Sequence, residues 1–325
     1  MIFSDKRSIL RTGRAHRKQK IKDKGPHIHI TRPTSKVTGM SNLQNRSHIH
    51  YLRSMGLLRQ SKDFLKYRIT SGTKYDVHSP FVFDLLTNVI NDKKNYPAYN
   101  KAEALRKKLL KDDTLITVTD LGAGSRKNIP KAFGATKKRV KDICRNAEKN
   151  KKYGQLLFRL VDHFKPQLIF DLGTSLGVTT LYLSEAAPSA KIISIEGCPQ
   201  TAAIAQKNFD EANAHNIQLV NANFDDVLEN LLDQNCKPQT IKCKLFFFDG
   251  NHRKEPTLRY FEQCLQYSAN NDVMIFDDIH WSGEMQEAWE TIMKNESITV
   301  TIDLFFMGIA FLRKEQVKQD FVLRF

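Results

Sequence analysis

The segment Gln167–Ser184, QLIFDLGTSLGVTTLYLS, constrains the fold of this 325-residue chain more than any other. An apolar run ends at Asp171, a turn containing Gly173 and Gly177 follows, and an apolar helical pattern begins after it. A second apolar run, KIISIE, ends in Glu196, which comes 25 residues after Asp171. A strand, a glycine turn, a helix and a strand ending in an acid form half of a nucleotide-binding βαβ unit, in which the second acid binds ribose hydroxyls.

The rest of the C-terminal half continues this alternation. Its apolar runs predict strands near 168–171, 191–196, 217–221, 244–249 and 272–277, and helices near 177–186, 199–212, 225–234, 256–267 and 283–293. Such alternation indicates a parallel sheet with right-handed crossovers and helices on both faces. Two last β-rich runs, SITVTIDLFF and GIAFLRK, have no room for a helix between them and should form an antiparallel hairpin. The predicted fold class is therefore α/β: a Rossmann-like, seven-stranded, mostly parallel doubly wound sheet with a C-terminal antiparallel hairpin, plus an N-terminal helical cover.

Three regions follow from the changes in composition. Residues 1–54 are basic and polar without sustained apolar periodicity, and we predict a disordered tail. Residues 55–150 form a helical cover region: HSPFVFDLLTNVI, for example, has Ser79 as a plausible N-cap and Pro80 at the first helical position. Residues 131–150 are also predicted to form a charged helix. The alternating sheet occupies residues 151–325.

A second glycine turn, DLGAGS at Asp120–Ser125, competes with the first as a nucleotide loop. A nucleotide loop requires an apolar helix and a second acid-ended strand within about 25 residues. The sequence that follows, KNIPKAFGATKKRVKDICRNAEKNKK, has an early proline and no strand pattern. We therefore interpret this turn as a structural hairpin or a lid on the substrate side.

The net charge of +16 is concentrated in the tail. Residues 1–54 hold 13 Lys/Arg and two acids, a net charge of +11, and the remaining 271 residues carry only +5. The tail is either a solvated or upstream extension, with the natural product starting at Met40 or Met55, or a nucleic-acid-binding arm held by phosphate contacts, or a targeting segment.

Composition also bears on the compartment. No run of about eighteen apolar residues occurs, so we expect no membrane span. The five cysteines are scattered, odd in number and without a CxxC pair, which favours a reducing compartment and argues against a zinc site or a disulfide framework. We expect a cytoplasmic protein.

A parallel sheet that ends in a hairpin, with DxGxxxG after its first strand, resembles the class I S-adenosylmethionine (SAM)-dependent methyltransferases over residues 154–325. The motif DLGTSLGVTTLYLS is similar to the first motif of the catechol and caffeoyl-CoA type O-methyltransferases. Residues 55–325 resemble an uncharacterised bacterial methyltransferase family, with HSPFVFDL, DGNHRKEPTLRYFE and DDIHWSGEMQEAW. The resemblance implies SAM as cofactor and O-methylation of a small-molecule hydroxyl. NAD is disfavoured because Ser175 stands where its GxGxxG motif has the second glycine.

The cofactor would lie on the first glycine loop. Gly173 and Gly177 allow a close backbone approach, so that amide groups at the helix start can meet the methionine carboxylate. Glu196 would accept the two ribose hydroxyls. The resemblance places an adenine contact at Asn223, with Asp225 as a weaker candidate. The complete set of predicted cofactor residues is Asp171, Gly173, Thr174, Ser175, Gly177, Glu196, Asn223 and Asp225.

Three acids follow the fourth and fifth predicted strands: Asp249, Asp277 and Asp278. Ligands in open α/β sheets lie beyond these strand ends. In cation-dependent O-methyltransferases, an Asp and an Asp-Asn pair at these places bind a divalent metal, and hard carboxylate oxygens suit Mg²⁺, Ca²⁺ or Mn²⁺. Here Asp278 replaces the Asn, and Gly250, Asn251 and His252 replace the Lys and Tyr that usually follow the first acid.

Two other interpretations of these acids stay open. His252 is a candidate general base oriented by a carboxylate, with Asp249 as its partner and His280 as a second candidate base. Alternatively, His252 caps the next helix and the acids bind lysines.

Alternative functions remain as well. The +11 tail suggests an RNA or DNA methyltransferase, although no NPPY-like tetrapeptide follows the fourth strand. A non-catalytic SAM-binding protein is the other alternative, because Gly173, Gly177 and Glu196 indicate binding and not turnover. The partner is expected to be a small-molecule acceptor, with nucleic acid through residues 1–54 as the alternative, and a homodimer is conceivable.

Overall fold

The computed structural model describes residues 59–119, 135–236 and 241–325. Both the predicted basic tail and the Asp120–Ser125 turn lie outside these residues, so the expectations for them remain predictions.

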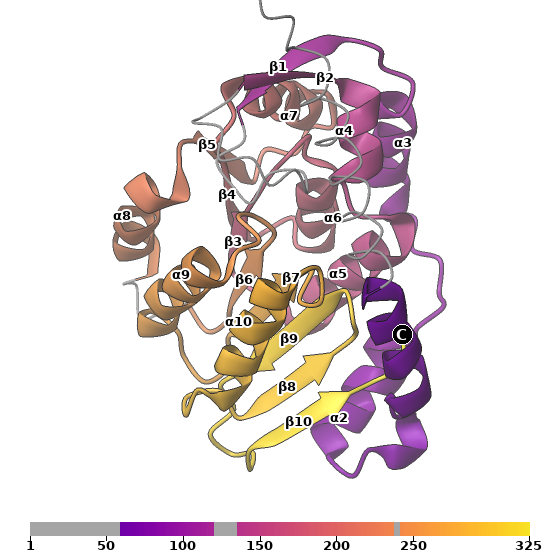
Figure 1. Cartoon of the computed structure of the whole chain (residues 1–325). Coiled ribbons are helices and arrows are strands. Elements are labelled where there is room, and N and C mark those ends of the chain that lie inside the picture. Colours follow the sequence, from indigo (N-terminus) through magenta and orange to yellow (C-terminus); the bar gives the residue numbers. More distant parts are fainter. Residues whose placement is uncertain (1–58, 120–134, 237–240) are drawn as a thin grey trace, which may run out of the picture. The chain divides into compact units, whose positions relative to one another are not determined.

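Within the described residues, one eight-stranded sheet forms the centre of the fold, with the strand order β10-β8-β9-β7-β6-β3-β4-β5 (Figure 1). β9 is antiparallel to both of its neighbours, and the other adjacent strands are parallel. The predicted α/β sheet with an antiparallel C-terminal hairpin is confirmed. The strands are β3 (Leu168–Leu172), β4 (Lys191–Glu196), β5 (Ile217–Asn221), β6 (Lys244–Phe248), β7 (Val273–Asp277), β8 (Val300–Asp303), β9 (Met307–Phe311) and β10 (Gln319–Val322).

The sheet has one strand more than predicted. β10 is a four-residue edge strand that pairs in parallel with β8, and its residues alternate between half-buried and exposed. Because it is short and half polar, it lacks the apolar run that marked the other strands. By contrast, every residue of β3, β6 and β7 is buried, as expected for central parallel strands covered on both faces.

Helices cover the two faces of the sheet through separate apolar clusters. On one face, α8, α9 and α10 pack against the side chains of Phe170, Phe246 and Phe276. On the other face, α2, η2 and α5 pack against Ile169 and Phe247. The bounds are α2 (Pro80–Leu85), the π-helix η2 (Leu86–Ile90), α5 (Lys151–Phe164), α6 (Val178–Ala186), α7 (Pro199–Glu211), α8 (Phe224–Cys236), α9 (Lys254–Gln266) and α10 (Gly283–Lys294). The doubly wound arrangement is therefore confirmed.

The region before α5 is more varied than the helical cover we expected. It holds a helix over residues 59–70, the 3-10 turn η1 (Lys74–Asp76), α2, η2 and α3 (Tyr99–Leu109). It then forms an antiparallel pair, β1 (Leu115–Thr119) and β2 (Ala135–Arg139), which flanks the predicted glycine turn. A third apolar cluster joins α3, α6 and α7 to this pair.

The charged helix predicted over residues 131–150 is wrong in part. Of the described residues 135–150, Ala135–Arg139 form strand β2 and only α4 (Val140–Asn146) is helical. The chain then leaves the helical path, and α5 starts afresh with the side chain of Asn150 accepting a hydrogen bond from the Tyr153 backbone N–H at 3.2 Å. Propensity favoured one continuous helix because the run is rich in Lys, Arg and Ala, but β2 occupies its first described part and the N-cap at Asn150 starts a separate helix after it.

Among the described residues, no helix combines the length and the apolar character that crossing a bilayer requires.

Candidate active site

A large cleft, with a volume of about 1350 Å³, opens at the carboxyl ends of β3, β4, β6 and β7. The loops that follow these strands form one part of its wall, and residues of β1, β2, α4 and the connection between α4 and α5 form the rest of it together with the loop after β5. Eight of the residues predicted from the sequence line it: Gly173, Ser175, Glu196, Asn223, Asp249, His252, Asp277 and Asp278. Residues that are distant in the chain are therefore gathered where an open α/β sheet binds its ligands.

Gly173 allows two of these loops to touch along their backbones. Its φ is +126°, and a Cβ at this position would lie 2.4 Å from the backbone carbonyl oxygen of Asp249. Gly177 begins α6 with φ of +88°, and a Cβ there would meet the Phe209 ring at 2.6 Å. Both glycines are therefore needed for the shape of the turn, because the Asp249 backbone and the Phe209 ring leave no room for a side chain.

Gly173→Ala should lower the free energy of unfolding by about 2–5 kcal/mol, because the strained φ and the overlap with Asp249 add. Chemical denaturation of the full chain measures this. Gly283→Ala is the matched control: there the Cβ would meet only the flexible end of Arg59 at 3.0 Å. Equal losses in the two variants would contradict the role assigned to the Gly173 turn.

Glu196 ends β4 and connects the cleft loops. Its carboxylate accepts hydrogen bonds from the backbone N–H of Ser175 at 2.9 Å and from that of Cys198 at 2.8 Å. One side chain thus ties the glycine loop after β3 to the turn after β4. The same carboxylate lines the cleft.

Asp171 is placed differently from the other predicted cofactor residues. It is fully buried, its Oδ2 accepts from the hydroxyls of Thr180 at 2.6 Å and Ser194 at 2.7 Å, and burial raises the pKa of this carboxyl. Thr174 bonds to the same Ser194 hydroxyl. These contacts support the loop from within the fold, and neither side chain is among the described residues that line the cleft.

Gly177 and Asp225 do not line the cleft among the described residues either. Asp225 pairs with Arg259 at 2.6 Å, and both side chains are exposed. Asn223 does line the cleft, so of the two residues predicted for the adenine contact Asn223 is the one on the cleft wall.

The three predicted acids lie at the ends of their strands, and a lysine lies among them. The Lys149 ammonium is 3.1 Å from Asp249 Oδ1 and also contacts Asp277 Oδ2. Burial alone would lower the pKa of Lys149, but the carboxylates of Asp249, Asp277 and Asp278 outweigh burial and raise it. Burial and the Asp277 charge raise the pKa of Asp249 well above its ordinary value, while Lys149 opposes that rise. An ion-paired cluster therefore occupies the floor of the cleft.

The two candidate histidines are separated by the fold. His252 lines the cleft, with its Nε2 at 3.8 Å from Asp249 Oδ1. His280 instead bonds through Nε2 to Asp303 at 2.7 Å and stacks on the Phe305 ring at 5.0 Å between centroids. Among the described residues that line the cleft, only His252 of this pair occurs.

Glu148 is a further buried acid beside the glycine loop. Its Oε1 accepts from the Leu176 backbone N–H at 2.7 Å, and burial raises the pKa of this carboxyl to about 7. The guanidinium of Arg106 donates to the backbone carbonyls of Cys144, Glu148 and Lys149. The segment between α4 and α5 is thereby held on both sides, and it presents Glu148 and Lys149 to the cleft.

The raised pKa of Glu148 makes stability depend on pH. The folded state binds this proton more tightly than the unfolded chain does, so the stabilisation is complete below the ordinary pKa of 4.5 and is lost as pH rises through about 7. Glu148→Gln keeps an acceptor for Leu176 without titrating. Denaturation at a series of pH values should show the wild type losing up to about 3 kcal/mol relative to this variant over that window. A pH-independent difference between the two would contradict this assignment.

Glu148 and Lys149 were not among the residues predicted for the site. Both lie inside a charged stretch that was interpreted as a single helix, where alternating charges are ordinary surface features. Asn150 is the residue in the sequence that could have indicated their position. Its side chain caps the start of the amphipathic helix α5 by accepting a hydrogen bond from the Tyr153 backbone N–H, so Glu148 and Lys149 lie in the break before that helix.

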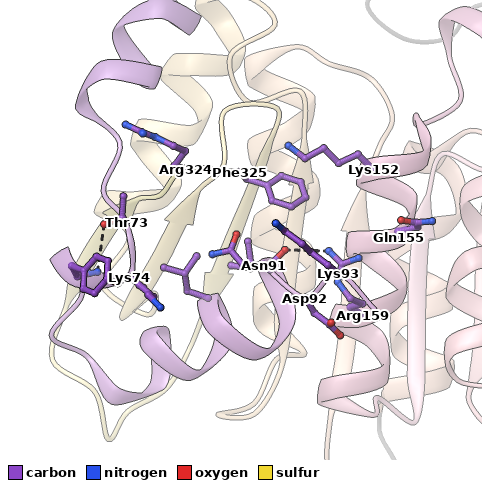
Figure 2. Close-up of a pocket in the computed structure, with 13 residues that line it drawn as sticks. Thr73, Lys74, Asn91, Asp92, Lys93, Lys152, Gln155, Arg159, Arg324 and Phe325 are labelled. Atoms are coloured by element: carbon purple, nitrogen blue, oxygen red, sulfur yellow. Dashed lines mark hydrogen bonds between the residues drawn. The ribbon is translucent and has the colours of Figure 1, made fainter. Parts of the chain in front are cut away.

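A second cavity of about 580 Å³ lies between η1, η2 and α5 (Figure 2). Lys74, Lys93, Lys152 and Arg324 line it, and the Lys152 ammonium lies 3.9 Å from the centre of the Phe325 ring. None of the residues predicted for the site lines this cavity. We assign it no part in the chemistry.

Comparison with known proteins agrees with this geometry. A family model described as a methyltransferase domain matches residues 170–279, which run from β3 to the turn after β7. A catechol O-methyltransferase of Niastella koreensis is 29% identical over 134 residues, which cover 41% of this chain and 58% of that protein. A transmembrane O-methyltransferase of Homo sapiens is 36% identical over 87 residues, which cover 25% of this chain and 29% of that protein. The chain thus spans less than two thirds of the length of these curated relatives.

The O-methyltransferase from Bacillus cereus, in complex with S-adenosylhomocysteine (SAH), superposes with a TM-score of 0.45 and 15% identity, covering 74% of this chain and 97% of that one. The matched sequence segment contains both the glycine loop and the acids of the cleft floor.

Proposed function

We propose that this chain, whose methyltransferase domain is of the class I SAM-dependent O-methyltransferase type, transfers a methyl group from SAM to a hydroxyl of a small molecule. One observation carries the proposal: a single cleft joins the glycine loop and Glu196 to an ion-paired cluster with a histidine. A donor site and an acceptor site within the same cleft are what direct group transfer requires.

The residues on the donor side fit SAM. Gly173 lines the cleft without a side chain that would cover the loop backbone, Glu196 offers a carboxylate for the two ribose hydroxyls, and Asn223 lines the same cleft. The N-terminal turn of α6 lies directly after this loop, where backbone amides favour a carboxylate. We assign the donor site to these residues.

On the acceptor side, His252 is the general base. In this proposal the imidazole accepts the hydroxyl proton, the Asp249 carboxylate stabilises the imidazolium that forms, and the proton later passes to solvent from the half-buried ring. When bound, SAM would supply an electrophilic sulfonium methyl group, and the residues of this chain would orient the acceptor oxygen toward it and accept the hydroxyl proton. The Lys149 ammonium stabilises negative charge developing on the acceptor oxygen.

The acceptor is proposed to be a small aromatic hydroxyl compound. Tyr153, Trp281 and Phe306 line the cleft near the acids, and flat side chains favour a flat substrate. A curated relative named catechol O-methyltransferase supports this choice.

Incubation of the full chain with SAM and a panel of phenols, catechols and aliphatic alcohols, read by mass spectrometry, tests the function. We expect SAH and a singly methylated aromatic product, with His252→Asn as the inactive control. Methylation of RNA alone, lost at high salt and in a truncation starting at Met55, would contradict the small-molecule proposal and favour the nucleic-acid alternative.

A further inference from the structure

We propose that the Lys149 ammonium is the permanent cation of the acceptor site, standing where cation-dependent O-methyltransferases hold a divalent metal, so that methyl transfer by this chain needs no metal ion. The proposal rests on the proposed function for its catalytic part. Its structural part, the competition between Lys149 and a metal for one place, stands on geometry alone.

The position of Lys149 carries the argument. Its Nζ lies 3.1 Å from Asp249 Oδ1 and contacts Asp277 Oδ2, which are the first two of the three acids proposed for a metal. These side chains are 14%, 10% and 2% exposed, so the ion cluster is removed from solvent. One oxygen of Asp249, one of Asp277 and a ring nitrogen of His252 lie within 4.8 Å of one another, close enough to surround a cation. An ammonium has no lone pair to offer a metal and would repel it. The residues present therefore do not fit a divalent ion while Lys149 is in place.

Lys149 is held there by its backbone. Arg106 on α3 donates to the carbonyl oxygen of Lys149 at 3.0 Å and to that of Glu148 at 3.3 Å. Glu148 anchors the same segment to the Leu176 backbone, and Asn150 caps α5 immediately afterwards. A lysine on a segment fixed at three successive residues is a built part of the site, unlike an exposed side chain that swings into it.

The charge of the acid cluster agrees with a resident lysine. Asp278 stands where cation-dependent relatives usually have Asn, so this chain carries three carboxylates around the position. All three raise the pKa of Lys149. The additional acid thus stabilises the ammonium, and a buried charge of this kind requires such partners.

The hydrogen-bond donors of Lys149 give it a catalytic role in this proposal. An ammonium has three N–H donors, of which Asp249 and Asp277 account for two. The third can donate to the acceptor oxygen and stabilise the charge that develops there as His252 removes the proton. A metal would act on the oxygen in the same way, by charge and orientation.

Manganese binding tests the structural part without any acceptor. Mn²⁺ is titrated into the full chain and followed by electron paramagnetic resonance. Lys149→Ala exposes the carboxylates and should bind Mn²⁺ at least about tenfold more tightly than the wild type, since hard carboxylate oxygens favour this ion. Lys149→Arg keeps a cation, and Lys151→Ala removes the exposed partner of Glu103, so both should resemble the wild type. In Lys149→Ala, Asp277→Asn should abolish the gain.

A chelation experiment on the wild type needs no variant and covers the case in which Lys149→Ala fails to fold. Wild type treated with EDTA should keep its methyl transfer rate and its affinity for SAH. Tight Mn²⁺ binding by the wild type, loss of activity on chelation, or a folded Lys149→Ala that binds Mn²⁺ no better than the wild type would each overturn the proposal. Failure to bind SAH or to methylate any acceptor would instead count against the proposed function, whatever the Mn²⁺ result.

Discussion

Glu196→Ala should weaken binding of SAH by about 100-fold or more, because two hydrogen bonds from ribose hydroxyls to a carboxylate contribute about 3 kcal/mol together. The variant also loses the carboxylate that joins Ser175 to Cys198, so the glycine loop becomes less ordered before the ligand arrives. Isothermal titration calorimetry on the full chain measures the change. The affinity of Glu196→Gln for SAH should lie between that of the wild type and that of Glu196→Ala, since the Gln amide oxygen accepts one hydrogen bond without the charge.

Glu211→Ala is the matched control for this measurement. Glu211 ends α7, the helix after β4, and its carboxylate pairs with Lys108 on the surface, with both side chains about half exposed. Its loss should leave SAH affinity at the wild-type level. If Glu196→Ala and Glu211→Ala bound SAH equally well, the donor site would have been assigned to the wrong strand end.

His252→Asn should lower kcat by about 10²- to 10⁴-fold while leaving SAH affinity unchanged, because a positioned general base contributes a factor of that size to the chemical step. The side chain lines the cleft beside Asp249. Steady-state kinetics with a phenolic acceptor gives the change in kcat.

His280→Asn separates this role from general damage. His280 bonds to Asp303 and stacks on Phe305, so its replacement should lower stability while kcat per folded molecule stays close to that of the wild type. Should His280→Asn lose turnover and His252→Asn retain it, the proton would be removed by the other histidine and the acceptor would lie elsewhere.

The central strands could be predicted from the sequence within about a residue at each end, because buried parallel strands are short apolar runs that no exposed helix resembles. The glycine loop was predictable for a related reason. Gly173 must adopt a φ that other residues avoid, so the sequence has a glycine at this position. β10 could not be predicted from an apolar run, because an edge strand accepts polar residues at alternating positions.

The acceptor side was predictable only in part. The strand ends identified Asp249, Asp277 and Asp278, because topology alone brings the carboxyl ends of parallel strands together. Topology does not show which cation meets these acids. Lys149 lies outside the matched methyltransferase segment, in a break between two helices whose backbone is held by Arg106. One open interpretation of the sequence was that the acids bind lysines, and the contacts of Lys149 agree with it.

Asp171 shows a different limit. Its place at the end of an apolar run suggested a ligand contact, but its side chain points to Thr180 and Ser194 within the fold. Alternation along a strand decides which side of the sheet a residue faces, and the two hydroxyl groups that donate hydrogen bonds to this buried carboxyl come from two other elements, α6 and β4. A single sequence does not reveal such partners before the fold is known.

A crystal structure of the full chain grown with SAH tests the central claim most directly. We predict that the ribose hydroxyls lie on the Glu196 carboxylate, that the backbone of the Gly173 turn contacts the ligand, and that its sulfur faces the side of the cleft formed by Asp249 and Lys149. SAH bound elsewhere, or a cleft that stays empty at saturating ligand, would contradict the assignment of this chain as a SAM-dependent methyltransferase.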